Sequence, residues 1–215
     1  MRAESVVWLL TWSLALHATG VGAEDLVTET PSPYIAPEGR ALLVLIRERL
    51  YGKATRFRVL DDNARCVSVI KGERHVLLPL DPGAHRLYLL VAGTRDQAEV
   101  LHLEVEGGRT YVIDIRTQWR RRDYMDINTV RPGTDRADKA AKDIQNTDLY
   151  EPDLDQCTEW VEKKGDELGR KITYADEQWT SGGEPYQRAH TLKRDEGFTA
   201  EQVASWKQAP DRRRR

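Results

Sequence analysis

The chain has 215 residues, and its 33 Lys and Arg residues nearly balance its 35 Asp and Glu residues. The resulting net charge of −2 argues against a nucleic-acid-binding protein, because such proteins usually carry a clear basic excess. This length accommodates one ordinary domain with an extension, or two small domains.

Residues 1–23, MRAESVVWLLTWSLALHATGVGA, have the pattern of a secretory signal peptide, with a basic start, an apolar run and small residues at the end. We expect cleavage between Ala23 and Glu24, which predicts a periplasmic or secreted product with no membrane span. The alternative is an uncleaved anchor, but the apolar run is shorter than the roughly 20 residues that a spanning helix needs. No cysteine lies near the cleavage point, so we expect no lipid anchor.

Residues 24–39 contain three prolines, which predicts an extended lead-in. Residues 40–117 then alternate short apolar runs with turn residues, without an intervening helical pattern. This spacing makes the protein mainly β and favours an antiparallel β-sandwich of about seven strands. The expected strands are 41–50, 55–61, 64–70, 74–80, 85–91, 98–106 and 109–117.

Side-chain patterns within these runs predict where some strands lie. The first run is apolar on both faces at its start, as in a central strand, and 55–61 and 64–70 are expected to form a hairpin. Pro79 demotes the end of its run to an edge or a strand exit, because proline cannot donate to a ladder. Alternation places Tyr111, Ile113 and Ile115 on one face.

Residues 118–215 are expected to form a polar, helical and partly flexible C-terminal extension. The segment 134–145 predicts a short helix, and a second helix begins at Pro152 and carries an apolar stripe to Ile172. A loop is expected at 180–183, and Thr199 with Gln202 resembles a capping box that opens a last short helix. Three tryptophans favour docking of this extension onto the sandwich: Trp160, Trp179 and Trp206.

Cys66 and Cys157 are the only cysteines in the chain. In an oxidising compartment such a pair often forms a disulfide, which here would tie the extension to the β domain. Two separate buried thiols are the alternative, because the sequence does not show whether the α-carbons come within bonding distance.

Common enzyme signatures are absent: the sequence has no P-loop, no G-x-S-x-G elbow, no H-E-x-x-H and no dinucleotide fingerprint, and we expect no cofactor. One constellation carries possible chemistry. If 85–91 and 98–106 form a hairpin, His85 falls near Glu104, with His102 diagonal to it. Two imidazoles and a carboxylate are able to bind a divalent metal or to serve acid–base catalysis. A slip of one residue in register would place His85 on the other face of the sheet.

Three segments are similar to a family of bacterial exported proteins and lipoproteins whose domain has no known function. They are PEGRALLV at 37–44, LDPGAHRL at 80–87 and GGRTYV at 107–112. The resemblance covers about residues 37–117 and implies an immunoglobulin-like or transthyretin-like sandwich without known catalytic residues. It also implies that His85 satisfies backbone groups near the start of its strand.

Together these observations predict an exported, non-catalytic binding or envelope-associated module. The first alternative is a metal-dependent or hydrolytic enzyme that uses His85, His102 and Glu104. The second is a periplasmic accessory protein that holds another envelope protein through a sheet edge or through its tryptophan-bearing extension.

Overall fold

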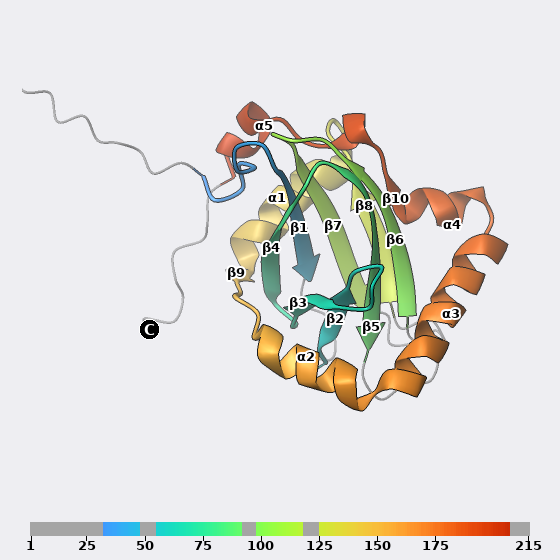
Figure 1. Ribbon diagram of the computed structural model, residues 1–215. Coiled ribbons are helices and arrows are strands. Elements are labelled where there is room, and N and C mark those ends of the chain that lie inside the picture. The colour runs from blue at the N-terminus through green and yellow to red at the C-terminus, as the bar shows by residue number, and fades with distance from the viewer. Residues whose placement is uncertain (1–31, 48–54, 92–97, 118–124, 207–215) are drawn as a thin grey trace, which may run out of the picture. The chain divides into compact units, whose positions relative to one another are not determined.

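Two five-stranded sheets pack face to face in the computed structural model, which describes residues 32–47, 55–91, 98–117 and 125–206 (Figure 1). Sheet A has the strand order β8-β7-β1-β4-β9, and sheet B has the order β10-β6-β5-β2-β3. The strands of sheet A are β1 (Ala41–Arg47), β4 (Arg74–Leu80), β7 (Thr110–Thr117), β8 (Met125–Val130) and β9 (Asp148–Leu149). Those of sheet B are β2 (Phe57–Leu60), β3 (Cys66–Ile70), β5 (Gly83–Val91), β6 (Ala98–Val105) and β10 (Thr191–Leu192).

All seven strands predicted between residues 40 and 117 are present, so the mainly β prediction is confirmed. The antiparallel prediction is wrong for three pairs, because β1 runs parallel to β7, β4 to β9 and β6 to β10. The chain crosses between the two sheets several times and enters β7 beside β1 in the same direction. Local alternation predicts that a strand exists, but it does not predict the direction of its neighbour.

Several finer predictions are confirmed. β1 lies at the centre of sheet A and is buried along its whole length. β2 and β3 form the expected hairpin around Asp61, whose Oδ1 accepts hydrogen bonds from the backbone N–H groups of Asn63 and Arg65. In β4, β9 pairs only with Arg74 and His75, which leaves the Pro79 end of the strand without that neighbour.

The main core lies between the two sheets. Tyr111, Ile113 and Ile115 of β7 face it, as predicted, and meet residues such as Phe57 and Val59 of β2. Each of these side chains is fully buried, so the inner faces of the two sheets account for the largest apolar cluster. Burial of this kind is the dominant favourable contribution to folding.

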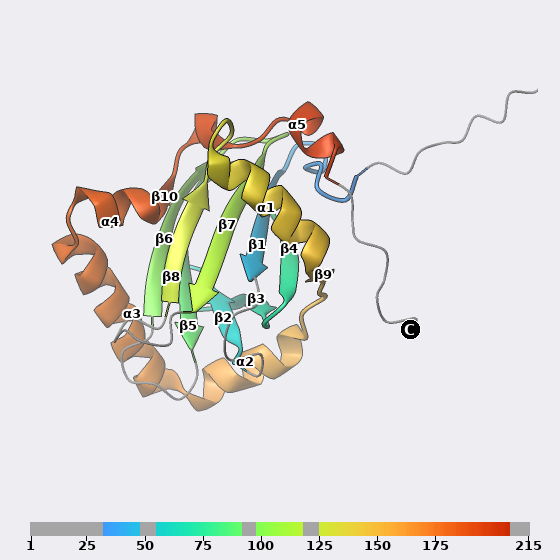
Figure 2. The ribbon, with the colours of Figure 1, turned by 180° about the vertical axis from the view of Figure 1, so that it is seen from behind.

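Helices cover the outer face of each sheet (Figures 1 and 2). α1 (Asp135–Asn146) packs on sheet A through Ala140 and Ile144. α2 (Leu154–Lys163) and α3 (Gly165–Ser181) pack on sheet B through residues that include Cys157, Leu168 and Ala175. The described part of the chain is therefore layered as helix, sheet, sheet and helix.

The segment predicted as an extension is an integral part of both sheets. It contributes β8 and β9 to sheet A and β10 to sheet B, and it continues through α4 (Glu184–Ala189), the 3₁₀ helix η1 (Arg194–Glu196) and α5 (Ala200–Ala204). Residues 40–117 alone therefore make an incomplete sandwich. The change of composition near residue 117 marks a change in exposure, since the later elements lie mostly at edges and on outer faces.

The helices confirm the predictions in part. α1 matches the expected helix at 134–145, and the capping box at Thr199 opens α5. The single helix expected from Pro152 is divided in two at Lys164, where the backbone leaves the helical region and α3 restarts at Gly165. α3 extends to Ser181, so the predicted loop is reduced to Gly182 and Gly183.

Cys66 of β3 and Cys157 of α2 form a disulfide, with their α-carbons 6.0 Å apart. Its effect is to fasten α2 to sheet B, and no free cysteine remains. The predicted signal peptide, its cleavage between Ala23 and Glu24 and the first part of the lead-in lie outside the described residues. None of the helices that the structure describes has the length and apolarity needed to cross a membrane.

Candidate functional site

The predicted constellation of His85, His102 and Glu104 does not form. β5 and β6 make the expected antiparallel hairpin, but in it His85 lies opposite Leu103, while His102 lies opposite Arg86. Directly opposed residues point to the same face, so His85 is on the core side of sheet B and the other two are on its outer side. The prediction fails because the true register differs by one residue from the assumed one.

Each of these three residues has contacts of its own. His85 Nε2 lies 2.7 Å from the Asp81 backbone oxygen, as the resemblance implied for this turn. The His102 ring stacks on Trp179 of α3, with ring centroids 4.1 Å apart, and Glu104 is exposed at the sheet surface. Within the described ranges, no three His, Cys, Asp or Glu side chains lie together so as to hold a metal ion.

The tryptophans of the C-terminal segment dock as predicted. Trp160 of α2 packs against Arg58, whose guanidinium carbon lies 4.0 Å from the ring centroid. Trp179 covers His102, and burial, followed by the nearby Arg86 charge, lowers the pKa of that imidazole. Trp206 is buried against Tyr34 on the side of sheet A. Each ring is therefore used in packing.

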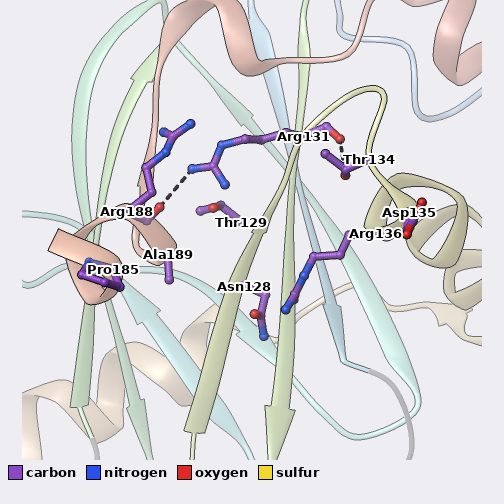
Figure 3. Close-up of a pocket in the computed structure, with 9 residues that line it drawn as sticks. All are labelled: Asn128, Thr129, Arg131, Thr134, Asp135, Arg136, Pro185, Arg188 and Ala189. Atoms are coloured by element: carbon purple, nitrogen blue, oxygen red, sulfur yellow. Dashed lines mark hydrogen bonds between the residues drawn. The ribbon is translucent and has the colours of Figure 1, made fainter.

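A different group of polar side chains surrounds a cleft of about 470 Å³ at one corner of the sandwich (Figure 3). The end of β8 and the turn after it contribute one wall, which includes Asn128 and Thr129. The first turn of α1 contributes Asp135 and Arg136, and α4 contributes the opposite wall. We call this space the corner cleft.

The sequence between β8 and α1 sets the shape of the corner cleft. Gly133 adopts a φ of 73°, in the left-handed region that glycine tolerates, and so turns the chain sharply from the strand into the helix. Thr134 stands at the N-cap, but its hydroxyl donates to the Arg131 backbone oxygen and accepts no hydrogen bond from the helix N–H groups. The first backbone N–H groups of α1 are therefore left without a side-chain cap, and they carry the positive end of the helix dipole.

Three arginines border the corner cleft, and two of them share one carboxylate partner. Arg131 Nε lies 2.9 Å from Glu196 Oε1, and Arg188 pairs with both oxygens of the same carboxylate. Burial would raise the pKa of Glu196, but hydrogen bonds from Arg188, the Lys193 backbone N–H and Arg131 outweigh it and lower that pKa to about 2. Glu196 is thus ionised at all ordinary pH values.

Arg136 is the arginine that remains available. It is exposed, and it makes no hydrogen bond or ion pair with any residue in the described part of the chain. In Figure 3 its side chain extends from the start of α1 toward Asn128. It therefore places a free guanidinium at the side of the corner cleft where the helix begins.

Two buried polar groups beside the corner cleft have no protein partner. Thr129 is only 4% exposed, and neither its Oγ1 nor Asn128 Nδ2 forms a hydrogen bond within the described residues. The Thr129 side chain points from β8 toward α4 (Figure 3). A buried polar group without a partner costs about 1–3 kcal/mol, so such groups usually meet a water molecule or a ligand.

Sequence reasoning missed the corner cleft because its walls come from distant parts of the chain. Residues 128–136 and 185–189 meet only when α4 closes over the free edge of β8. The one local signal is Arg131-Pro132-Gly133-Thr134, a turn that opens a helix whose first turn carries both acidic and basic residues. That signal predicts a helix start, but it does not show what lies opposite.

Comparison of the sequence with protein-family models and with curated proteins found no match. The resemblance of residues 37–117 to an exported bacterial family therefore stays a prediction.

Proposed function

We propose that this protein is an exported, non-catalytic binding module that holds an anionic group in the corner cleft. The observation that carries the proposal is that the buried, unpartnered Thr129 hydroxyl lines the same cleft as the uncapped start of α1 and the free Arg136 guanidinium. Hydroxyl, amide, guanidinium and helix N–H groups all donate hydrogen bonds. A site built from donors in this way favours a negatively charged oxygen ligand.

Both charged and uncharged hydrogen-bond donors line the corner cleft. The α1 N-terminus supplies a fixed partial positive charge, and Arg136 supplies a full charge that is not paired with any carboxylate in the described part of the chain. The Asn128 amide and the Thr129 hydroxyl add uncharged, buried donors from the two faces of β8. Anions bind well where such groups are already in place, because little ordering is needed on binding.

Two observations support export. The first 23 residues have a signal pattern, and the disulfide between Cys66 and Cys157 is typical of proteins from oxidising compartments. A binding role without catalysis agrees with a corner cleft that has donors but no nucleophile paired with a base. The enzyme alternative loses its basis, since His85 does not share a face with His102 and Glu104.

The proposal is tested by titrating the ¹⁵N-labelled protein, from residue 24 onward, with sodium acetate and sodium phosphate at constant ionic strength. We expect saturable shifts of the Asp135 and Arg136 amide signals with at least one of these anions. Arg136→Gln should weaken that binding roughly tenfold, which is the effect of losing one hydrogen bond to a charged group.

Lys142→Gln is the matched control, because Lys142 is an exposed cation on the same helix that does not line the corner cleft. It should leave the affinity unchanged, and neither variant should shift the melting temperature. Shifts that do not saturate, or an Arg136→Gln variant that binds as the parent does, would contradict the proposal.

A further inference from the structure

We infer that the corner cleft takes a monoanion attached to an apolar body, a carboxylate on a small hydrocarbon or ring, in preference to a dianion such as phosphate. This inference rests on the proposed function and names the chemical class of its ligand. Its two supports are the balance of charges around the corner cleft and the apolar character of the α4 wall.

The charges around the corner cleft leave one positive charge to be matched. Arg131, Arg136 and Arg188 face two carboxylates, which belong to Asp135 at the rim and to Glu196 behind the arginines. The Glu196 side chain is only 12% exposed and accepts from both Arg131 and Arg188, so this carboxylate is a fixed part of the site. A ligand with one negative charge therefore brings the site to neutrality, whereas a dianion leaves an uncompensated charge.

Another ion pair beside Asn128 does not change this balance. Asp114 lies opposite Asn128 in the β7–β8 ladder, and its Oδ2 is 2.6 Å from a guanidinium nitrogen of Arg116. The two charges of this pair cancel.

The wall formed by α4 is partly apolar where it faces the corner cleft, because Arg188 is the only charged residue among the α4 residues that line it. Pro185 and Ala189 line it, so a ligand that reaches this wall gains from burying hydrocarbon. The volume of about 470 Å³ exceeds what one carboxylate group fills, and it lies within the range of pockets for small organic ligands. Arg136 suits the carboxylate end, because a guanidinium and a carboxylate pair through two parallel hydrogen bonds.

The test compares benzoate, acetate and inorganic phosphate at pH 8 by isothermal titration calorimetry and by the same amide shifts. We expect benzoate to bind more tightly than acetate, and acetate more tightly than phosphate. Glu196→Gln and Asp135→Asn each remove one negative charge, and each should raise phosphate affinity roughly fivefold, as expected for one more unit of charge in a solvated site. Benzoate affinity should change less.

Asp138→Asn is the matched control. Asp138 also lies in the first turn of α1 and is exposed, but it does not line the corner cleft. Asp135→Asn keeps the test decisive if Glu196→Gln fails to fold, because Asp135 holds none of the arginines in place. Folding of each variant is checked by thermal melting.

The outcomes separate this inference from the proposed function. Phosphate that binds the parent protein more tightly than benzoate does, or a phosphate affinity that Asp135→Asn leaves unchanged, would overturn the monoanion assignment while the anion site stands. Binding of none of the three anions, or binding that Arg136→Gln does not weaken, would overturn the proposed function itself.

Discussion

The two sheets are covered on their outer faces by quite different means. On sheet A, α1 joins Tyr34, Phe198 and Trp206 in an apolar layer over β1 and β7. On sheet B, α2 and α3 are strongly charged, and only a few of their side chains are buried. This second cover is fastened by a disulfide and by two stacked contacts, Arg58 with Trp160 and His102 with Trp179.

The difference shows where polar groups are used in packing and where they remain available. Under α2 and α3, arginine and histidine side chains lie against tryptophan rings, so their polar ends contribute to holding the cover in place. Arg136 at the start of α1 and Thr129 of β8 have no such partners in the described part of the chain. The tryptophans, which the sequence makes conspicuous, are structural, and the candidate site lies on the less conspicuous side.

The largest expected effect on stability comes from breaking the disulfide that joins α2 to sheet B. Removing the disulfide with Cys66→Ala and Cys157→Ala should lower the free energy of unfolding by about 4 kcal/mol, because the two cysteines are 91 residues apart and their bond restricts the unfolded chain. Urea unfolding with and without dithiothreitol measures this loss. The reductant should destabilise the parent protein and leave the double variant unaffected.

Hydrogen exchange compares how strongly the disulfide stabilises the helices on the two sheets. After reduction, amide protection should fall more in α2 than in α1, since no covalent bond holds α1 to sheet A. Equal loss of protection in the two helices would mean that the disulfide stabilises the whole molecule and not one cover.

Acidification should act on the cover of sheet A through His75. This residue is fully buried between Tyr34 Oη, at 3.0 Å, and Thr147 Oγ1, at 2.9 Å, and burial lowers its pKa to about 4. The unfolded chain binds a proton more readily than the folded one between about pH 6.5 and 4, so stability should fall as the pH drops through that range. A shift of this size corresponds to roughly 3 kcal/mol.

Urea unfolding at pH 7.5, 5.5 and 4 measures this change. His75→Gln should remove most of it, since the amide does not titrate. His102→Gln serves as the comparison: burial also lowers the pKa of His102, but that side chain is half-buried, so most of the pH dependence should remain. A parent protein equally stable at pH 7.5 and 4 would show that His75 is not held in its neutral form.

The smallest effect should come from a stacked contact of the sheet B cover. Trp160→Ala should cost about 1–2 kcal/mol, because it removes a half-buried ring and leaves the Arg58 guanidinium without its aromatic partner. Trp160→Phe keeps a ring under the cation and should cost about half as much, as measured by urea unfolding at pH 7.5. If the two variants lose the same stability, then the contact between Arg58 and the ring contributes nothing beyond packing volume.

The sequence predicts local elements such as strands and hairpins better than it predicts which residues of two strands lie opposite each other. The β5–β6 hairpin was expected from two alternating runs and a glycine between them, yet the residues that face each other depend on the loop and on packing against the second sheet. A shift of one residue in the β5–β6 register decides whether His85 lies on the same face of the sheet as His102 and Glu104. The helix divided at Lys164 is a similar case, since the apolar stripe continues through the break, with α2 packed on β3 and α3 on β6.

The sequence by itself determined the features that depend on neighbouring residues. These are the seven strands of residues 40–117, the central position of β1, the helix at 135–146 and the cap of α5 at Thr199. Side-chain periodicity and capping act over a few residues, so they can be recognised within one short segment of the sequence. Only the tertiary structure decided the parallel pairs, the three strands supplied from beyond residue 117 and the corner cleft. Each of these brings together segments far apart in the chain, and their meeting depends on the packing of the whole sandwich.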